Sequence, residues 1–320
     1  MTGVHTPVHT MTTSVVTAFA PASVGNVAVG FDLLGHSIEG PGDRVTASPT
    51  REAGARLVGI EGCVTELPRD PAENTATRAA QSLIDAHAPG AGVDLTLHKG
   101  IPLSSGLGGS AASAVAAVVA TAAALDLRLD AHALYPHALA GEAVASGAAH
   151  GDNVGPQLLG GLVLALPDRL VRVPVPAGLW AAVVHPHTEL STRASRDALR
   201  DPFPIEVVVA QTSRLALVLS GCHDNDIDRI DAGLEDLLVE PRRKHLIPGF
   251  DAVRAAALDH RALGASISGA GPSVFGWFRS RSDAERASEA MAQAFASHGL
   301  AADRHVSPVD GPAARRVEEG

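Results

Sequence analysis

The chain of 320 residues is 46% hydrophobic and only 3% aromatic, with a formal net charge of −10. This length is typical of one large or two medium domains, and the composition predicts a sizeable core of helices and aliphatic strands. The negative charge argues against a nucleic-acid partner, which needs a basic patch, although a local basic pocket could still bind a small anion.

The sequence contains no pattern that predicts export or insertion into a membrane. Residues 1–13 lack the basic and apolar parts of a signal peptide, so we expect a disordered leader there. The longest apolar run, residues 111–125, is too short and too rich in alanine to span a bilayer. Cys63 and Cys222 match no metal-binding spacing and are interpreted as reduced thiols. We therefore expect a soluble, cytoplasmic protein with no membrane partner.

Strand and helix patterns alternate in the first half of the chain. They predict strands at 14–20, 43–48, 93–98 and 160–166, and helices at 73–88 and 130–146. Asn74 is well placed to cap the first helix. In the strand at 93–98, Val93, Leu95 and Leu97 point to one side and polar residues to the other, as in a half-buried strand.

A pair of prolines between residues 173 and 180 marks a domain boundary. The expected domains are residues 14–175 and 176–320. The second one is predicted to hold a strand at 179–184, several helices between 192 and 260, a strand–turn–strand at 264–278, a helix at 282–298 and a final strand. This mixture indicates two α+β domains.

The stretch "HKGIPLSSGLGGSAASAVAAVVA", residues 98–120, runs from a strand through a glycine-rich turn into a helix. Such a turn gathers free backbone N–H groups at the positive end of the helix dipole, which is an anion site in principle. Ser110 stands at the helix start, where it can cap the helix or ligate a metal. The spacing fits neither a P-loop nor a dinucleotide-binding turn. By spacing alone, a flexible loop before a core helix remains an equal alternative.

Three motifs in order carry a family resemblance. "PLSSGLGGSAAS" (102–113) resembles the second signature of the GHMP small-molecule kinases, "APASVGNVAVGFDLLG" (20–35) the first and "ASISGAGPSVFG" (265–276) the third. The sequence is identified as a member of this family. The resemblance implies an α+β GHMP kinase fold, in which an N-terminal domain like domain 2 of ribosomal protein S5 precedes a ferredoxin-like C-terminal domain. The active site is expected between them.

The resemblance also implies ATP and Mg²⁺ as cofactors, with the second signature wrapped around the triphosphate. The residues that would bind ATP are Pro102, Leu103, Ser104, Ser105, Gly106, Leu107, Gly108, Gly109, Ser110, Ala111 and Ala112. Gly109 departs from the family pattern, which has a serine there, so one hydroxyl is missing. Ser110 and Glu142 are the expected Mg²⁺ ligands.

Asn153 occupies the place where other family members carry an aspartate near the acceptor hydroxyl. An amide cannot act as a base at neutral pH, so we expect catalysis by Ser110, Glu142 and Asn153 without a dedicated carboxylate base. The neighbouring Asp152 is a weaker alternative for that role.

Within the family, the first motif is most similar to members that phosphorylate L-homoserine. The residues expected to bind this acceptor are Asn26, Asp32, His150, Thr192, Arg196 and Arg243. An amino-acid alcohol has a carboxylate that suits arginine and an ammonium that suits Asp32. Taken singly, these residues have plainer interpretations: Asp32 as a turn residue, Arg243 in a solvated basic run and Thr192 as a helix cap.

The expected reaction converts ATP and L-homoserine to ADP and O-phospho-L-homoserine, on the route to threonine. The alternatives are a GHMP kinase for another small alcohol such as mevalonate, or a catalytically silent ATP-binding regulator. Many family members are homodimers, so the resemblance makes a homodimer a possible assembly, although the sequence itself reveals no interface.

Overall fold

The computed structural model describes residues 14–147 and 149–317, so the expected leader at residues 1–13 lies outside the described part. A seven-stranded sheet forms the N-terminal half, in the order β11-β1-β2-β4-β3 with β5 joining β2 and β6. Its strands are β1 (Val16–Gly25), β2 (Leu34–Thr50), β3 (Gly54–Gly62), β4 (Gly92–Lys99), β5 (Leu162–Ala165), β6 (Leu170–Val173) and β11 (Arg315–Val317). The strands pair antiparallel except β3 and β4, which are parallel and are joined through a helix.

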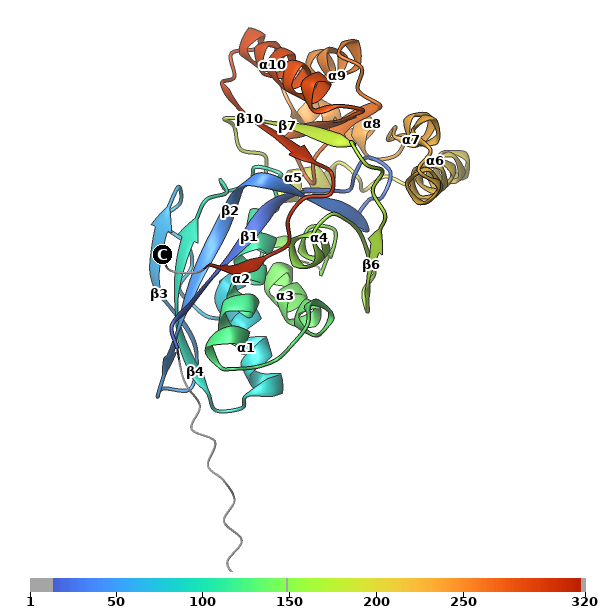
Figure 1. Cartoon of the computed structure of the whole chain (residues 1–320). Coiled ribbons are helices and arrows are strands. Elements are labelled where there is room, and N and C mark those ends of the chain that lie inside the picture. Colours follow the sequence, from blue (N-terminus) through green and yellow to red (C-terminus); the bar gives the residue numbers. More distant parts are fainter. Residues whose placement is uncertain (1–13, 148, 318–320) are drawn as a thin grey trace, which may run out of the picture.

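Helices cover one face of this sheet (Figure 1). They are α1 (Thr75–His87), α2 (Gly109–Ala124), α3 (Ala131–Ser146) and α4 (Val154–Leu159). Helix α2 lies in contact with α1, α3 and the sheet, and 12 of its 16 residues are buried. Alanine on all sides lets these neighbours approach closely, and a helix that is apolar all round belongs in a core.

Local sequence signals in this half are confirmed. The Asn74 side chain accepts hydrogen bonds from the N–H groups of Ala76 at 3.0 Å and Thr77 at 3.2 Å, and α1 starts directly after it. Val93, Leu95 and Leu97 are completely buried on β4. The strand therefore turns its apolar side to the helices, as its alternation predicts.

The C-terminal half is built on a second, antiparallel sheet in the order β10-β7-β9-β8. Its strands are β7 (Trp180–Pro186), β8 (Gly264–Ile267), β9 (Val274–Phe278) and β10 (Ala302–Pro308). Counted along the chain this is the order 4-1-3-2, the ferredoxin-like arrangement that was expected. Helices α9 (Phe250–Asp259) and α10 (Arg281–Ser297) pack against it (Figure 1).

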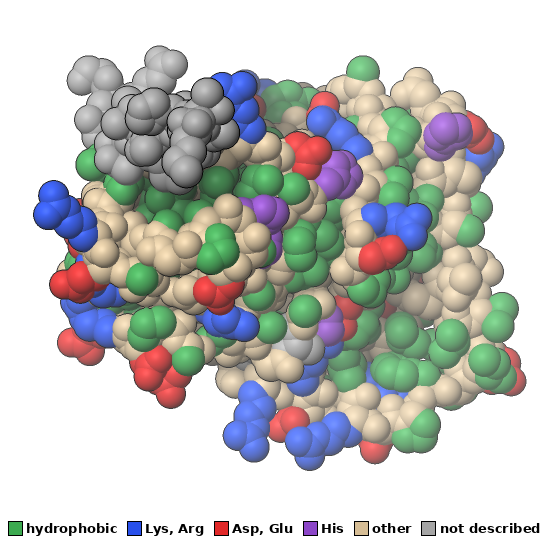
Figure 2. Space-filling model, turned by 90° about the horizontal axis from the view of Figure 1, so that it is seen from below, with side chains coloured by type: hydrophobic (Ala, Val, Ile, Leu, Met, Phe, Trp, Pro, Cys, Tyr) green, Lys and Arg blue, Asp and Glu red, His purple; other side chains and the backbone are tan. Residues whose placement is uncertain are grey.

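Four shorter or more peripheral helices lie between β7 and α9. They are α5 (Thr192–Asp197), α6 (Ile205–Asp224), α7 (Ile227–Gly233) and α8 (Glu240–Arg243), followed by a 3₁₀ turn at Lys244–Leu246. Among the described residues, α6 alone is long and apolar enough to cross a membrane, with 22% of its apolar window buried. It packs on α7 through a buried side that includes Val218 and Cys222. The face of the molecule in Figure 2 carries charges of both signs in scattered positions.

The last strand returns to the first sheet. β11 pairs antiparallel with β1, with Thr17 opposite Val317. The predicted division at residues 175 and 176 stays a prediction, and β11 is one segment that crosses it.

A buried contact joins the two halves. Trp277 Nε1 on β9 donates to His36 Nε2 on β2 at 3.1 Å, and His36 Nδ1 lies 3.1 Å from the Ser37 carbonyl. Complete burial lowers the pKa of His36 to about 4, so the ring is neutral, with its one proton on Nδ1. The imidazole therefore donates within β2 and accepts the one of these two bonds that crosses to the second sheet.

Candidate active site

A cavity of about 420 Å³ brings together residues that are far apart in the sequence. Part of its wall is the glycine-rich loop, including Ser104, Gly106 and Ser110. Asp32, Arg196 and Arg243 line the same cavity, as do the residues Asn26, Glu142, His150 and Asn153. One hollow of the molecule thus contains both the expected nucleotide loop and the expected acceptor residues.

The glycine-rich loop ends at the N-terminus of α2, where Gly108 is the N-cap in a left-handed conformation with φ 69°. A Cβ at Gly108 would lie 2.4 Å from Ser23 Oγ and 2.8 Å from Asn153 Oδ1, so a side chain there would displace these hydrogen-bonded groups as well as strain the left-handed backbone. No side chain caps this helix, which leaves its first amide N–H groups available beside the cavity. These donors and the helix dipole suit a phosphate.

The third motif closes on this loop, forming the turn between β8 and β9. Ser268 Oγ donates to the Gly106 carbonyl at 2.7 Å, and Ser273 Oγ donates to the Ser105 carbonyl at 2.6 Å. A Cβ at Gly106 would stand 2.6 Å from the Ser268 carbonyl oxygen. The C-terminal half therefore fixes the shape of the loop from outside.

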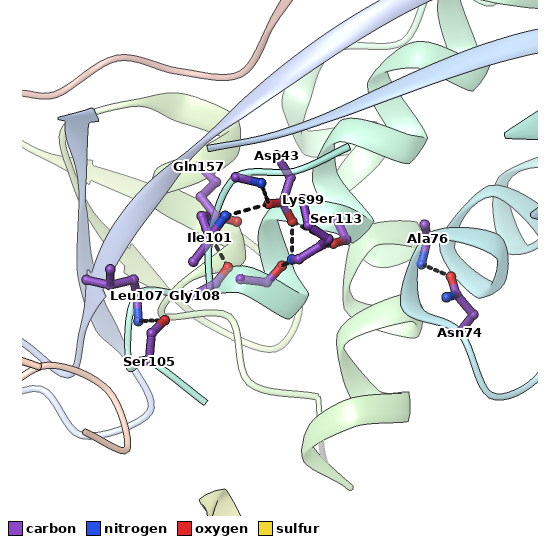
Figure 3. A network of polar contacts seen from close by, with 12 residues as sticks. Asp43, Asn74, Ala76, Lys99, Ile101, Ser105, Leu107, Gly108, Ser113 and Gln157 are labelled. Atoms are coloured by element: carbon purple, nitrogen blue, oxygen red, sulfur yellow. Dashed lines mark hydrogen bonds and ion pairs between the residues drawn. The ribbon is translucent and has the colours of Figure 1, made fainter. Parts of the chain in front are cut away.

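A buried ion pair fixes the loop from inside, as Figure 3 shows. Lys99 Nζ bonds to Asp43 Oδ2, and it also donates to the Gly109 carbonyl at 2.9 Å. Asp43 accepts a further bond from Ser113 Oγ at 2.6 Å and one from the Ile101 N–H at 3.2 Å. Sequence reasoning did not identify Asp43. The pairing of β2 with β4 brings it beside Lys99, and that pairing is not visible in a single strand.

Ser110 and Glu142 meet at the start of α2. The Ser110 hydroxyl is hydrogen-bonded to the Glu142 carboxylate, which is 8% exposed on α3. Burial raises the pKa of Glu142 to about 7, the Asp152 charge adds to this, and Ser110 and Lys99 oppose it. Two hard oxygen donors at a phosphate-binding helix terminus fit Mg²⁺, which takes few protein ligands and completes its shell with phosphate oxygens and water.

Asn153 is held beside the nucleotide loop at the N-terminus of α4. Its Oδ1 accepts from Ser23 Oγ at 2.9 Å, and Ser23 in turn accepts from Gln157 Nε2 at 3.1 Å. Gln157 also donates to the Gly108 carbonyl at 3.0 Å. This chain of bonds sets the position of the Asn153 amide relative to the loop.

Asp32 is the centre of an ionic cluster. Both of its oxygens accept from Arg196, each at 2.7 Å, and His150 Nδ1 lies 3.3 Å from Oδ2. Asn26 Oδ1 accepts from the Asp32 N–H at 2.9 Å, and Asn26 Nδ2 donates to the Gly269 carbonyl at 2.8 Å. The Asn26 side chain therefore positions Asp32 and ties it to the C-terminal half.

Arg243 lies behind this cluster and is 2% exposed. Its Nε donates to the Ser195 carbonyl at 2.9 Å, and the guanidinium groups of Arg243 and Arg196 lie 5.2 Å and 5.1 Å from the centre of the Phe31 ring. Burial lowers the pKa of Arg243 to about 10, with Arg196 contributing in the same direction. A bound anion would relieve both effects. Phe31 was not predicted, although it directly precedes Asp32 in the first motif.

The backbone of the first motif is strained where it enters the site. Asn26, Val27 and Ala28 have φ values of 67°, 40° and 58°. This left-handed region is costly for a β-branched residue such as Val27, and strain of this kind concentrates at functional sites. Thr192 begins α5, whose N-cap is Ser191, and the Thr192 side chain lies outside the described part of the structure.

The sequence of this chain is similar to those of known kinases. The chain matches the family models of the GHMP kinases N terminal domain over residues 74–161 and GHMP kinases C terminal over residues 218–297. It is 53% identical to a homoserine kinase from Xanthomonas campestris pv. campestris over 298 residues, which is 93% of this chain and 92% of that protein. The chain belongs to the homoserine kinase family.

Further homoserine kinases support the same family. One from Chlorobium phaeobacteroides is 40% identical, over 92% of this chain and 97% of that protein. The crystal structure of homoserine kinase from Cytophaga hutchinsonii superposes with a TM-score of 0.91 at 37% identity, over 98% of this chain and all of that one. Galactokinase from Lactococcus lactis, at 14% identity and a TM-score of 0.67, shares the fold.

Proposed function

We propose that this protein transfers the γ-phosphoryl group of ATP to the side-chain hydroxyl of L-homoserine, on the route to threonine. The products are O-phospho-L-homoserine and ADP. The observation that carries the proposal is the shared cavity, in which a helix N-terminus lies beside the Asp32, Arg196 and Arg243 cluster. Membership of the homoserine kinase family supports the same acceptor.

The charge of the cluster matches a zwitterion. Asp32 and Arg196 form an ion pair with each other. An amino acid can insert between them, because its carboxylate replaces Asp32 at the arginines and its ammonium replaces Arg196 at Asp32. An alcohol with a carboxylate but no ammonium, such as mevalonate, would draw Arg196 away from a partly buried Asp32 and supply no cation in its place, so that His150 alone would remain beside this carboxylate. Such a loss is costly in a partly buried site.

The nucleotide is placed by the chain in three ways. The loop amides and the α2 N-terminus bind the triphosphate, and Lys99 holds the Gly109 carbonyl so that the first turn keeps its shape. Ser110 and Glu142 would hold Mg²⁺. When bound there, the metal ion neutralises charge on the β- and γ-phosphates.

The transfer itself requires alignment more than covalent work from the protein. The bond from the γ-phosphorus to the ADP oxygen breaks, and a new bond forms to the homoserine oxygen. Asn153 donates through its amide to the reacting oxygens, with its orientation set by Ser23. The hydroxyl proton passes to a phosphate oxygen or to water, since an amide cannot take it.

The proposal is tested by ADP release with L-homoserine, mevalonate, galactose and shikimate as separate acceptors. We expect turnover with L-homoserine and none with the other three. The Glu142→Gln variant is the control, because it should remove activity from this site while any contaminating kinase would persist. Turnover with mevalonate but not with homoserine would overturn the proposal. We also expect the enzyme to be cytoplasmic and to have no nucleic-acid partner. A homodimer is a further expectation, which light scattering would test.

A further inference from the structure

Asp152 is a buried carboxylate in the wall of the active-site cavity that the mechanism above does not use. It is 4% exposed and lies against the paired glycines Gly25 of β1 and Gly35 of β2. A Cβ at Gly25 would lie 2.5 Å from its Oδ2, and a Cβ at Gly35 would lie 1.7 Å from its carbonyl oxygen. Glycine at both positions admits this residue to the cavity, so its place is built into β1 and β2.

Asp152 and its neighbour Asn153 have different hydrogen-bond partners. Asn153 bonds to Ser23, which belongs to the network of the nucleotide loop. Asp152 instead accepts from the N–H of Asn26 at 3.2 Å, at the start of the turn that carries Asp32. The side chain of Asp152 is therefore bonded to the turn that carries the expected acceptor residues Asn26 and Asp32.

Asp152 shares a nearby cation, Arg196, with Asp32. Among the ion pairs of the described residues none involves Asp152, and the nearby Arg196 is already held by both oxygens of Asp32. Burial raises the pKa of Asp152 to about 7, and the negative charge of Asp32 adds to the increase. Two carboxylates that line one cavity and repel each other electrostatically are stabilised together when a cation binds near both.

We propose that Asp152 and Asp32 together receive the α-ammonium group of the acceptor, and that Asp152 makes the site select amino acids over other hydroxy acids. This assignment rests on the proposed function. An ammonium has three N–H donors, so it can bond to both carboxylates at once. Arg196 and Arg243 then remain free to bind the acceptor carboxylate. Asp152 is in this assignment a specificity residue and takes no proton from the reacting hydroxyl.

The test is a cycle of two enzymes and two acceptors. Wild-type protein and Asp152→Asn are each assayed by ADP release with L-homoserine and with 4-hydroxybutanoate, which is homoserine without its amino group. We expect Asp152→Asn to lower kcat/KM for homoserine about 30- to 100-fold, mainly through KM, because a charged hydrogen bond is lost. With 4-hydroxybutanoate the same change should alter kcat/KM less than about threefold. Where turnover of 4-hydroxybutanoate is too slow to follow, its inhibition constant against homoserine gives the same comparison.

Two results would overturn the assignment. Equal losses in kcat for both acceptors would show that Asp152 acts on the hydroxyl, and equal increases in KM for both would show a structural role. Asp168→Asn, at an exposed aspartate, is the matched control and should change neither acceptor. If Asp152→Asn does not fold, Asp152→Ser repeats the cycle. Absence of homoserine turnover by the wild-type protein would contradict the proposed function itself, whatever the variants do.

Discussion

Arg196 and Asp32 form a two-bond ion pair, in which the two terminal guanidinium nitrogens lie 2.7 Å from different carboxylate oxygens. Each of these two groups is expected to hold one end of the acceptor. If the acceptor binds as proposed, it would replace this pair, so binding would move the side chains of Arg196 on α5 and of Asp32 apart.

The first prediction concerns the two arginines. Arg196→Ala and Arg243→Ala should each raise KM for L-homoserine about 10- to 100-fold, because a charged bond to the acceptor carboxylate is lost. KM for ATP should stay within about twofold. The variants should differ in stability, since Arg243 is buried and bonded to Ser195 whereas Arg196 is partly exposed. We expect only Arg243→Ala to lower the melting temperature clearly. A larger effect on ATP than on homoserine would show that both residues are misassigned.

The second prediction concerns the metal ligands. Ser110→Ala should raise the Mg²⁺ concentration needed for half-maximal activity several-fold, because one of two protein oxygen donors is removed. Titration of activity with MgCl₂ at fixed ATP measures this. Ser104→Ala, at another serine of the same loop, is the matched control and should leave the Mg²⁺ dependence unchanged. Identical titrations for wild type and Ser110→Ala would remove Ser110 from the metal site.

The third prediction uses the glycine at the start of α2. Gly108→Ala should weaken ATP binding at least tenfold, because its Cβ would collide with Ser23 and Asn153 and push the loop out of shape. Gly178→Ala is a matched control, since Gly178 also has a positive φ, of 82°, but no atom lies within 4 Å of its Cβ position. In both variants an alanine must adopt a positive φ, which costs about 1 kcal/mol of folding free energy. Equal ATP affinity in the two variants would contradict the role of Gly108.

The fourth prediction concerns pH and the His36 contact. The pKa of His36 is lowered to about 4 in the folded protein, against about 6.5 when unfolded. The unfolded chain therefore binds more protons between these values, and the neutral ring's contribution is complete above pH 6.5 and lost as the pH falls toward 4. Over that window wild type should lose about 3 kcal/mol more free energy of unfolding than His36→Gln.

Urea unfolding of both proteins at several pH values measures this difference. The comparison is needed because Glu142 and Asp152, whose pKa values are raised to about 7, change stability in the opposite direction. His132→Gln, at an exposed histidine, should follow wild type. Parallel curves for wild type and His36→Gln would show that His36 is not held neutral.

Much of the fold could be predicted because its signals are local. The Asn74 cap, the alternating faces of β4 and the glycines of the second motif depend on neighbours a few residues away. β3 and β11 were not predicted as sheet strands. β11 has only three residues and is exposed or half-buried, and β3 carries little apolar alternation, so both depend on partner strands that the sequence does not show.

For the site, too, some residues could be predicted from the sequence and others could not. Family motifs indicated Ser110, Glu142, Arg196 and Arg243, and the structure places them around one cavity. Lys99 and Asp43 are 56 residues apart in the sequence. Phe31 and the two arginines that it contacts come from different halves of the chain. No rule of sequence spacing predicts contacts of this kind. The Asp32–Arg196 pairing was likewise not foreseen, because each residue was assigned to a different end of the substrate.

The segment before the final strand is connected to the glycine-rich loop through Gln157. The Ala314 N–H donates to the Gln157 carbonyl at 2.7 Å, just before β11 joins β1. The side chain of the same Gln157 holds Ser23 and the Gly108 carbonyl. Gln157 is therefore hydrogen-bonded through its backbone to the segment before β11 and through its side chain to the glycine-rich loop, so this segment supports the position of Gln157. Deletion of the chain from residue 311 onward should therefore make the glycine-rich loop less well positioned, although it removes no residue that lines the cavity.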